Sequence, residues 1–253
     1  MLLLIDAGNT RVKWALAAPG AAAGEWFEVG AALHADLDAA AAAWQDRGVT
    51  RALVSNVAGA ALRERLAALL GPIDTEWFAS SAERAGLVNG YRDPLRLGCD
   101  RFAAAIGARA LAPGQALVVA TCGTATTVDA VTGDGRFAGG MILPGLALMA
   151  GALAKNTAQL PQAAPAVVPP SAPPPLFADN TNDAIVSGCL SAQAGAIERA
   201  VAAHGEALCI LSGGAAPYIA PALKCRYQLA DNIVLVGLHA VALDGLNMGD
   251  GTC

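Results

Sequence analysis

Two segments of the chain share one pattern: an apolar run, a small polar turn that contains glycine, and then an alternating strand. Residues 2–10 read LLLIDAGNT, and residues 116–125 read ALVVATCGTA. Gly8 and Gly123 lie 115 positions apart and take the same place in the two segments. An apolar run that ends in a glycine turn before an alternating strand is typical of a β-hairpin. The recurrence predicts two related halves, although two similar hairpins can also arise by chance.

Strand and helix patterns alternate after each hairpin. They cover residues 52–57, 60–70, 102–111, 183–203, 208–211 and 232–244. Such alternation predicts an α/β layer structure. The chain has 253 residues, which is enough for two domains of this kind. We expect them at residues 1–115 and 116–253.

Composition excludes several classes of protein. Apolar residues make up 55 % of the chain and charged residues only 15 %, which excludes disorder. The formal net charge is −5, so the chain has no general attraction to nucleic acid or to anionic lipid, and we expect neither as a partner. The six cysteines form no C-x-x-C pair and the three histidines no H-E-x-x-H motif, so a zinc site has no support.

One uncharged stretch is long enough to raise the question of a membrane span. Residues 137–154 would cover about 27 Å as a single helix, close to the thickness of a bilayer core. Several glycines and Pro144 interrupt the stretch, and this favours a strand, a tight turn and a short helix. The first residues form an apolar run without a basic leader. We therefore expect no membrane span and a cytoplasmic protein.

A proline-rich segment runs from Pro161 to Pro175 and holds seven of the 14 prolines. Proline is excluded from helix interiors and central strands, so an extended surface loop is expected. The simple interpretation is a spacer, and the alternative is a flap that orders on binding a ligand or partner.

The first hairpin is a candidate phosphate site. The chain has no Gly-Lys dipeptide, which excludes a Walker A loop, and no G-x-G-x-x-G after a strand. Backbone N–H groups at a glycine tip, with the small polar side chains of Asn9 and Thr10, can hold phosphate oxygens instead. Asp6, at the end of the apolar run, fits a Mg²⁺ ion bound to nucleotide phosphates. The alternative is an aspartate that caps its own turn.

The segment 91–101 ends in Gly98-Cys99-Asp100-Arg101, directly before a predicted helix. In a structural interpretation Asp100 caps the helix and Arg101 is solvated. In a functional interpretation Asp100 accepts the proton of an attacking hydroxyl, and Arg101 holds a substrate carboxylate in its fork of N–H donors.

Five motifs in this order and spacing resemble type III pantothenate kinases, and together they cover almost the whole chain. They are Asp6-x-Gly8-Asn9-Thr10-x-x-Lys13, Tyr91-x-x-Pro94-x-x-Leu97-Gly98-x-Asp100-Arg101, Gly123-Thr124-Ala125-x-Thr127, Gly139-Gly140-x-Ile142-x-Pro144-Gly145 and Asn180-Thr181-x-x-Ala184-Ile185-x-x-Gly188. The resemblance implies an α/β fold of two ribonuclease-H-like domains, as in the acetate and sugar kinase, heat-shock-protein-70 and actin superfamily, with nucleotide in the cleft between them.

The implied activity is transfer of the γ-phosphoryl group of ATP to pantothenate, the first step of coenzyme A synthesis, by a homodimer that uses Mg²⁺. By the family pattern, ATP would contact Asp6, Ala7, Gly8, Asn9, Thr10, Arg11, Val12, Lys13 and Thr124, with Ser212-Gly213-Gly214 nearer the adenosine. Pantothenate would contact Tyr91, Gly98, Cys99, Asp100, Arg101 and, across the dimer interface, Thr181. Asp100 would be the catalytic base, and Asp6 the metal ligand.

The chain departs from the family at one position. The second hairpin of most relatives begins with an aspartate that holds K⁺ or NH₄⁺, and this chain has Thr121 there. A neutral hydroxyl is a weaker cation ligand than a carboxylate. We therefore expect the monovalent-cation site to be absent or weak.

Two other functions remain open. One is a kinase of the same fold that acts on another small hydroxyl compound. The other is a regulator that binds ATP without turnover. The presence of Asp6, Asp100 and Arg101 favours a catalytic protein.

Overall fold

The computed structural model describes residues 1–45, 47–157, 160–161 and 173–249, and side chains of the last helix as far as residue 245. The chain forms two compact units. Unit 1 comprises residues 1–114, 135–137 and the segment from Asn232 onward, and unit 2 comprises residues 115–134 and 138–231. The last segment of the chain therefore belongs, by its contacts, to the unit that begins the sequence.

The sheet of unit 1 has five strands in the order β3-β2-β1-β4-β5. They are β1 (Leu2–Ala7), β2 (Arg11–Ala17), β3 (Glu28–Leu33), β4 (Arg51–Asn56) and β5 (Asp74–Trp77). β1, β2 and β3 pair in antiparallel fashion, whereas β4 runs parallel to both β1 and β5. The middle residues of β1 and β4, 3–5 and 52–54, are apolar and buried, as expected for strands covered on both faces.

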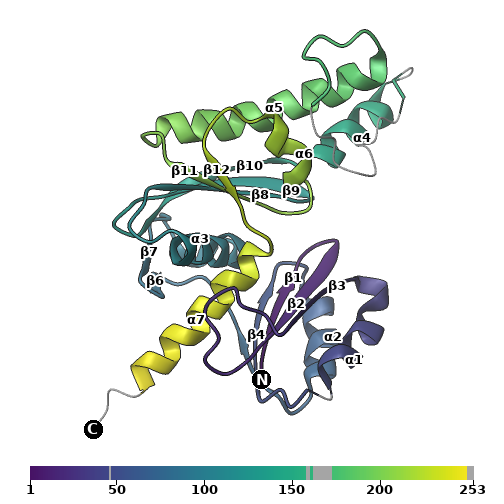
Figure 1. The fold of residues 1–253 in the computed structure, drawn as a ribbon. Coiled ribbons are helices and arrows are strands. Elements are labelled where there is room, and N and C mark those ends of the chain that lie inside the picture. The colour runs from purple at the N-terminus through teal and green to yellow at the C-terminus, as the bar shows by residue number, and fades with distance from the viewer. Residues whose placement is uncertain (46, 158–159, 162–172, 250–253) are drawn as a thin grey trace. The chain divides into compact units, whose positions relative to one another are not determined.

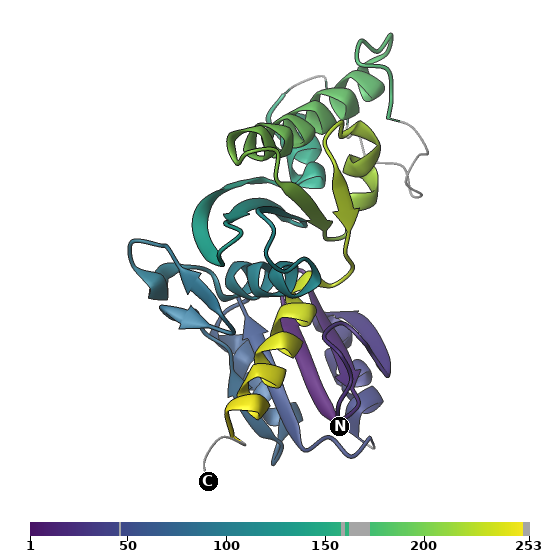
Figure 2. The same cartoon turned by 60° about the vertical axis from the view of Figure 1, so that its left-hand side comes forward.

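Helices cover both faces of this sheet. On one face α1 (Leu37–Gln45) and α2 (Ala60–Leu70) bury Trp44 and Leu66 against side chains of β1 and β2. On the other face α7 (Ile233–Gly249) contacts β1 and β4, and α3 (Cys99–Leu111) packs against α7 (Figures 1 and 2). The smaller elements of unit 1 are η1 (His34–Asp36), β6 (Glu83–Arg84), β7 (Leu87–Asn89) and η2 (Pro94–Arg96).

Two glycines set the distance between α3 and α7. A Cβ atom on Gly237 of α7 would lie 1.8 Å from the Ala103 carbonyl oxygen of α3. A Cβ atom on Gly107 of α3 would lie 2.4 Å from the Ile233 carbonyl oxygen of α7. The backbones of α3 and α7 therefore lie closer together than any residue with a Cβ atom would allow at these two positions. This contact fixes the position of α3 and hence of Asp100 and Arg101 in its first turn.

The sheet of unit 2 repeats the design of the first. Five of the seven strands in this sheet are β8 (Leu117–Cys122), β9 (Ala125–Val131), β10 (Arg136–Pro144), β11 (Leu208–Ser212) and β12 (Tyr227–Leu229), and the short β7 and β6 follow β10. The order β10-β9-β8-β11-β12 matches β3-β2-β1-β4-β5, and again an antiparallel hairpin is followed by two parallel pairings. On one face lie α4 (Leu146–Asn156), α5 (Thr181–Ala203), α6 (Ala216–Ile219) and η3 (Ala220–Ala222) (Figure 1).

The two hairpins differ by one residue at the tip. Residues 8–11 connect Ala7 to its partner Val12, whereas residues 123–125 connect Cys122 to Thr126. In unit 1 Asp6 lies opposite Lys13, and in unit 2 Thr121 lies opposite Thr127. Thr127 rather than Val128 is therefore the structural counterpart of Lys13.

The uncharged stretch 137–154 forms most of β10, a turn at Gly145 and most of α4, as predicted. Within the described ranges, no helix has both the length and the apolar character needed to cross a membrane. Most of the proline-rich segment, residues 162–172, lies outside the described residues.

Candidate functional site

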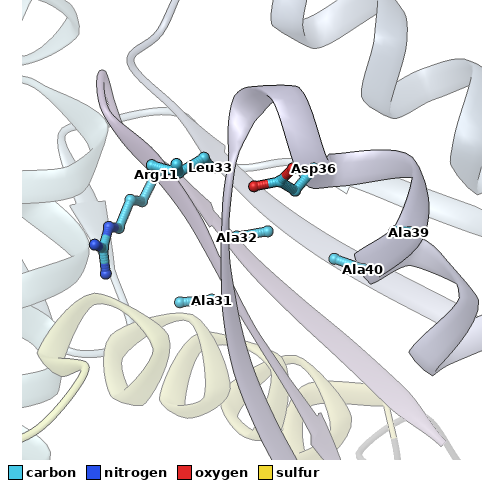
Figure 3. Close-up of a pocket in the computed structure, with 7 residues that line it drawn as sticks. All are labelled: Arg11, Ala31, Ala32, Leu33, Asp36, Ala39 and Ala40. Carbon is cyan, nitrogen blue, oxygen red and sulfur yellow. The ribbon is translucent and has the colours of Figure 1, made fainter.

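The tip of the β1–β2 hairpin presents small polar groups to solvent. The Gly8 N–H donates to the Arg11 carbonyl oxygen at 3.1 Å and closes the turn. Asn9 and Thr10, between them, are exposed. Arg11 borders a shallow hollow lined mainly by alanines of β3 and α1, and in Figure 3 its guanidinium points away from Asp36. The tip therefore has accessible backbone and side-chain groups around Gly8.

Two carboxyl groups of unit 1 lie close enough to influence each other. Asp6 lies between Lys13 of β2 and Ser55 of β4. Burial raises the pKa of Asp6 to about 6; the Lys13 charge lowers this pKa and the Asp100 charge raises it. The pKa of Asp100 is also raised, chiefly by burial, against the opposing effects of the Arg101 backbone N–H and the Arg101 charge. Both groups are therefore poised to accept a proton or to bind a cation.

Asp100 lies in the first turn of α3, and the N-cap of this helix is Gly98. The helix begins three residues earlier than expected, so Asp100 is inside the helix instead of capping it. Its carboxylate accepts the Arg101 N–H at 2.8 Å. A Cβ atom on Gly98 would lie 2.8 Å from the Asp100 Oδ1 atom, so glycine at this position leaves room for the carboxylate.

Arg101 is buried beside two aromatic rings of unit 1. The guanidinium carbon lies 5.6 Å from the centroid of the Tyr91 ring and 5.7 Å from that of Phe137. Its Nη1 donates to the Tyr91 hydroxyl at 3.0 Å. The two rings meet edge to face, with centroids 5.9 Å apart. A buried guanidinium held in this way is oriented before any ligand arrives.

Asn89 organises the loop that carries Tyr91. Its side-chain amide donates to the carbonyl oxygens of Ser81 and Pro94 at 3.0 and 3.1 Å, and its Oδ1 accepts the Tyr91 N–H at 3.0 Å. Asn89 is almost fully buried, so these bonds are shielded from water. Cys99, at the start of α3, approaches the Ser55 hydroxyl at 3.3 Å.

In unit 2 the second hairpin lies against two glycines. The Gly145 N–H donates to the Thr124 carbonyl oxygen at 2.9 Å, and the Ala215 N–H donates to the Cys122 carbonyl oxygen at 3.0 Å. A Cβ atom would lie 2.1 Å from the Gly123 carbonyl oxygen if added to Gly145, and 2.3 Å from the Cys122 carbonyl oxygen if added to Gly213. The motifs that contain these two glycines therefore pack directly on the hairpin.

The predicted residues divide between the two units. Unit 1 brings together the hairpin residues 6–13, Tyr91 and residues 98–101, whereas Thr124, Thr181 and Ser212-Gly213-Gly214 lie in unit 2. Thr181 is the first residue of α5 and lines an apolar groove between α4 and α5.

Sequence reasoning missed Asn89 and Phe137. Asn89 ends a short strand, and a polar residue there followed by a tight turn is a weak signal of a side chain that organises a loop. Phe137 gives no local signal, since it reaches Arg101 only because β10 pairs with β7.

The described residues contain no group of three or more His, Cys, Asp or Glu side chains arranged for a metal ion. Mg²⁺ bound to a nucleotide does not need such a group, because phosphate oxygens and water supply most of its ligands. The Asp6 carboxylate, with its raised pKa and Asp100 nearby, would gain from a cation at this point. The donor set therefore fits a magnesium nucleotide.

Comparison with known proteins agrees with this geometry. A family model described as type III pantothenate kinase matches residues 2–203. A type III pantothenate kinase from Herminiimonas arsenicoxydans is 56 % identical over 97 % of this chain and 99 % of its own length. One from Janthinobacterium sp. is also 56 % identical, over 96 % of this chain and 98 % of its own length.

Among solved structures, one described as a putative Baf family transcriptional activator from Campylobacter jejuni has a TM-score of 0.65 at 18 % identity, and covers 97 % of this chain and 99 % of its own. That likeness shows that the two chains share a fold. With a family model over most of its length and relatives that share more than half of its residues, the chain belongs to the type III pantothenate kinase family.

Proposed function

We propose that the protein transfers the γ-phosphoryl group of ATP to the primary hydroxyl of pantothenate, in the cytoplasm, as the first step of coenzyme A biosynthesis. The observation that carries this function is the family membership of nearly the whole chain. The site agrees with it, because Asp6, Asp100 and Arg101 lie in one unit, with Asp6 and Asp100 within reach of each other's charge.

The β1–β2 hairpin is assigned to the ATP phosphates. The exposed tip around Gly8 offers N–H groups, and Lys13 adds a positive charge beside Asp6. Asp6 is the residue that would hold Mg²⁺, which neutralises developing charge on the phosphoryl oxygens. Thr124, at the tip of the second hairpin, is assigned to the phosphates from unit 2. We take the two units to be the two ribonuclease-H-like domains.

Asp100 is assigned as the base that orients the pantothenate hydroxyl and accepts its proton. The transition state of phosphoryl transfer is loose, so positioning and electrostatics supply most of the stabilisation. Burial raises the pKa of Asp100 and so makes it a better proton acceptor. Tyr91, Gly98 and Cys99 are assigned to the walls of the same pocket.

Arg101 is assigned to the pantothenate carboxylate. A buried carboxylate needs a cation of fixed geometry, and Arg101 presents such a group in unit 1. The rings of Tyr91 and Phe137 hold Arg101 for this purpose. The proposed specificity is therefore for a small alcohol that carries one carboxylate.

A monovalent cation is assigned a minor role. The Thr121 Oγ1 is buried and has no hydrogen-bond partner in the described part of the chain. Thr127 and Ser212 lie on either side of Thr121 in the sheet. Hydroxyl and carbonyl oxygens can coordinate K⁺ or NH₄⁺, but without a carboxylate they bind it weakly. We propose that activity depends little on either ion.

The chain is also proposed to act as a homodimer through the α4–α5 groove. Leu148 beside the groove is 53 % exposed, and Leu176 and Phe177, just before α5, are 68 % and 92 % exposed. The Leu176 carbonyl oxygen accepts the Ser187 hydroxyl of α5, so this apolar segment lies against the same helix as the groove. A second copy related by two-fold symmetry can pair one apolar surface with the other, and Thr181 then lies at the interface.

The proposed function is tested by ATP-dependent release of ADP with the purified protein. Pantothenate is expected to elicit release, and sugars and acetate are not. Omission of potassium and ammonium is expected to leave the rate within about threefold, because Thr121 replaces the carboxylate. ATP binding without turnover on any acceptor would identify a regulator, and turnover on another alcohol would identify a different kinase of this fold.

Sedimentation tests the dimer. We expect the protein to sediment as two copies and Leu148→Glu to sediment as one, because a charge cannot be buried in an apolar interface without a partner. Leu229→Glu is the matched control, since Leu229 of β12 is also 53 % exposed but lies away from the groove. A monomeric parent protein would contradict the proposed homodimer.

Replacement of Asp100 by Asn is expected to lower kcat on the order of 10²–10⁴-fold, because the amide cannot accept the proton. The KM for ATP should change little. Asp74→Asn, on an exposed position of β5, serves as the control and should keep parental activity. A near-parental kcat in Asp100→Asn would remove Asp100 from the chemical step.

Replacement of Arg101 by Leu is expected to raise the KM for pantothenate about 10- to 100-fold, since the substrate carboxylate loses a charge-assisted pair. The KM for ATP should stay unchanged and serves as the internal reference. Arg96→Leu removes an arginine whose side chain is 84 % exposed and should behave like the parent protein. Unchanged pantothenate saturation in Arg101→Leu would mean that the carboxylate is bound elsewhere.

Replacement of Asp6 by Asn is expected to stabilise the protein without nucleotide at pH 8 by about 3 kcal/mol. The pKa of Asp6 is 3.8 in the unfolded chain and about 6 in the folded protein. Protonation of Asp6 therefore contributes stability that is fully present below pH 3.8 and is lost as the pH rises through 6. Denaturant unfolding should show that the variant's unfolding free energy exceeds that of the parent protein at pH 8, and that this difference is smaller at pH 4. A gap of equal size at both values would contradict burial as its cause.

A further inference from the structure

The imidazole of His34 contacts the backbone of the first hairpin. Its Nε2 lies 2.8 Å from the Gly8 carbonyl oxygen, at the tip of the β1–β2 turn. His34 begins η1, directly after β3, and β3 is the strand that pairs with β2. A side chain from a neighbouring element therefore holds the carbonyl of the glycine that the hairpin motif is built around.

The chemistry of this contact fixes where the proton lies. A carbonyl oxygen only accepts hydrogen bonds, so the Nε2 that faces Gly8 must carry a hydrogen. Both the neutral ring with its proton on Nε2 and the imidazolium satisfy this condition. The bond therefore persists whether or not His34 is charged.

A restraint on the Gly8 carbonyl is also a restraint on the next N–H group. The peptide unit between Gly8 and Asn9 is planar and trans, so its C=O and N–H bonds point in opposite directions. Holding the Gly8 oxygen on one side of the turn fixes the direction of the Asn9 N–H on the other. This N–H belongs to the exposed tip that is assigned to the ATP phosphates.

Backbone N–H groups hold the carbonyl oxygens at the tip of the second hairpin. Its Thr124 carbonyl oxygen accepts the Gly145 N–H at 2.9 Å, and its Cys122 carbonyl oxygen accepts the Ala215 N–H at 3.0 Å. Both donors belong to the backbone, so of all substitutions only one to proline would remove them. In the first hairpin the Ala7 carbonyl oxygen likewise accepts a backbone N–H, that of Val57 at 3.1 Å. The donor at the Gly8 carbonyl, however, is a side chain, which makes its contribution measurable by mutation.

His34 is itself anchored from α2. The Arg65 Nη1 donates to the His34 carbonyl oxygen, and the Arg65 Nη2 forms an ion pair with Asp38 of α1. His34 is half-buried, between exposed residues on either side. Its backbone is therefore tied to two helices while its ring reaches the hairpin.

We propose that His34 is a positioning residue for ATP: its Nε2–H holds the Gly8 carbonyl and so directs the Asn9 N–H towards the phosphates. This assignment rests on the proposed function, since it takes the first hairpin as the phosphate site. His34 does not touch the substrate, and the hydroxyl acceptor is bound by other residues.

The test compares His34→Leu with His34→Gln. Leucine removes the donor, and the carboxamide of glutamine restores an N–H at a similar reach. For His34→Leu we expect the KM for ATP and the dissociation constant for ATP, measured by calorimetry without pantothenate, to rise about tenfold. His34→Gln should recover most of this loss. The KM for pantothenate should stay within about twofold in both variants, because the Asp100 and Arg101 side chains are unaffected.

His204→Leu is the matched control. The His204 Nε2 also contacts a backbone carbonyl, that of Val131, at 3.0 Å, but it lies in unit 2 at the end of α5. This variant should bind ATP like the parent protein, even if its melting temperature falls. A rise in the ATP constants of equal size in His204→Leu and His34→Leu would mean general destabilisation and would overturn the proposal.

Calorimetry of ATP binding to the parent protein distinguishes failure of the proposed kinase function from failure of the role assigned to His34. If the parent does not bind ATP, the proposed function fails. If it binds ATP and folded His34→Leu binds equally well, only the role of His34 fails. Should His34→Leu not fold, Arg65→Gln keeps the imidazole but removes an anchor of the His34 backbone, so the ring is held less firmly against Gly8. This variant should raise the ATP dissociation constant about two- to threefold, and an unchanged constant would overturn the proposal.

Discussion

The burial of two acidic side chains near one another is the constraint on which unit 1 depends. Asp6 comes from the end of a central strand and Asp100 from the first turn of α3, and burial raises the pKa of each. Isolated carboxylates in such places are unfavourable. The structure offsets part of this cost with Lys13 beside Asp6 and with Arg101 beside Asp100. A site that is strained without ligand and relieved by a bound cation is a common feature of catalytic centres.

Rigid packing brings these groups together. Asp6 is fixed by its place between β2 and β4, and Asp100 is fixed by the contact of α3 with α7, where Gly107 and Gly237 allow the two backbones to meet. The segment that supplies α7 follows unit 2 in the sequence but packs in unit 1. The last part of the chain therefore helps to position Asp100, far earlier in the sequence. Truncation before Asn232 would remove α7, the helix against which α3 packs.

Local pattern was sufficient to predict the two hairpins, the helix at 60–70 and the layered α/β class, because each depends on periodicity within one segment. The helix that carries Asp100 starts earlier than expected, since Gly98 rather than Asp100 provides its N-cap. Local reasoning made Asp6, Asp100 and Arg101 candidates but left a structural alternative open for each, and the family resemblance favoured the functional interpretation. Phe137 and His34 could not be predicted, because they reach the site through strand pairings between distant segments. The one-residue difference between the hairpins was also hidden, since similar letters at a fixed offset do not reveal register.

The neutral pair Thr121 and Thr127, which occupies the places of Asp6 and Lys13, makes the two units electrically unlike although their strand order is the same. Near the first tip, Asp6 and Lys13 carry formal charges of opposite sign, and the exposed Arg11 adds a positive charge. The paired threonines that lead to the second tip offer only hydroxyl groups and peptide dipoles. Screening by dissolved salt acts mainly on formal charges at the surface and far less on short hydrogen bonds. Under the proposed function, rising ionic strength should therefore weaken the contribution of the exposed Arg11 beside the first tip to phosphate binding more than the contribution of the second tip.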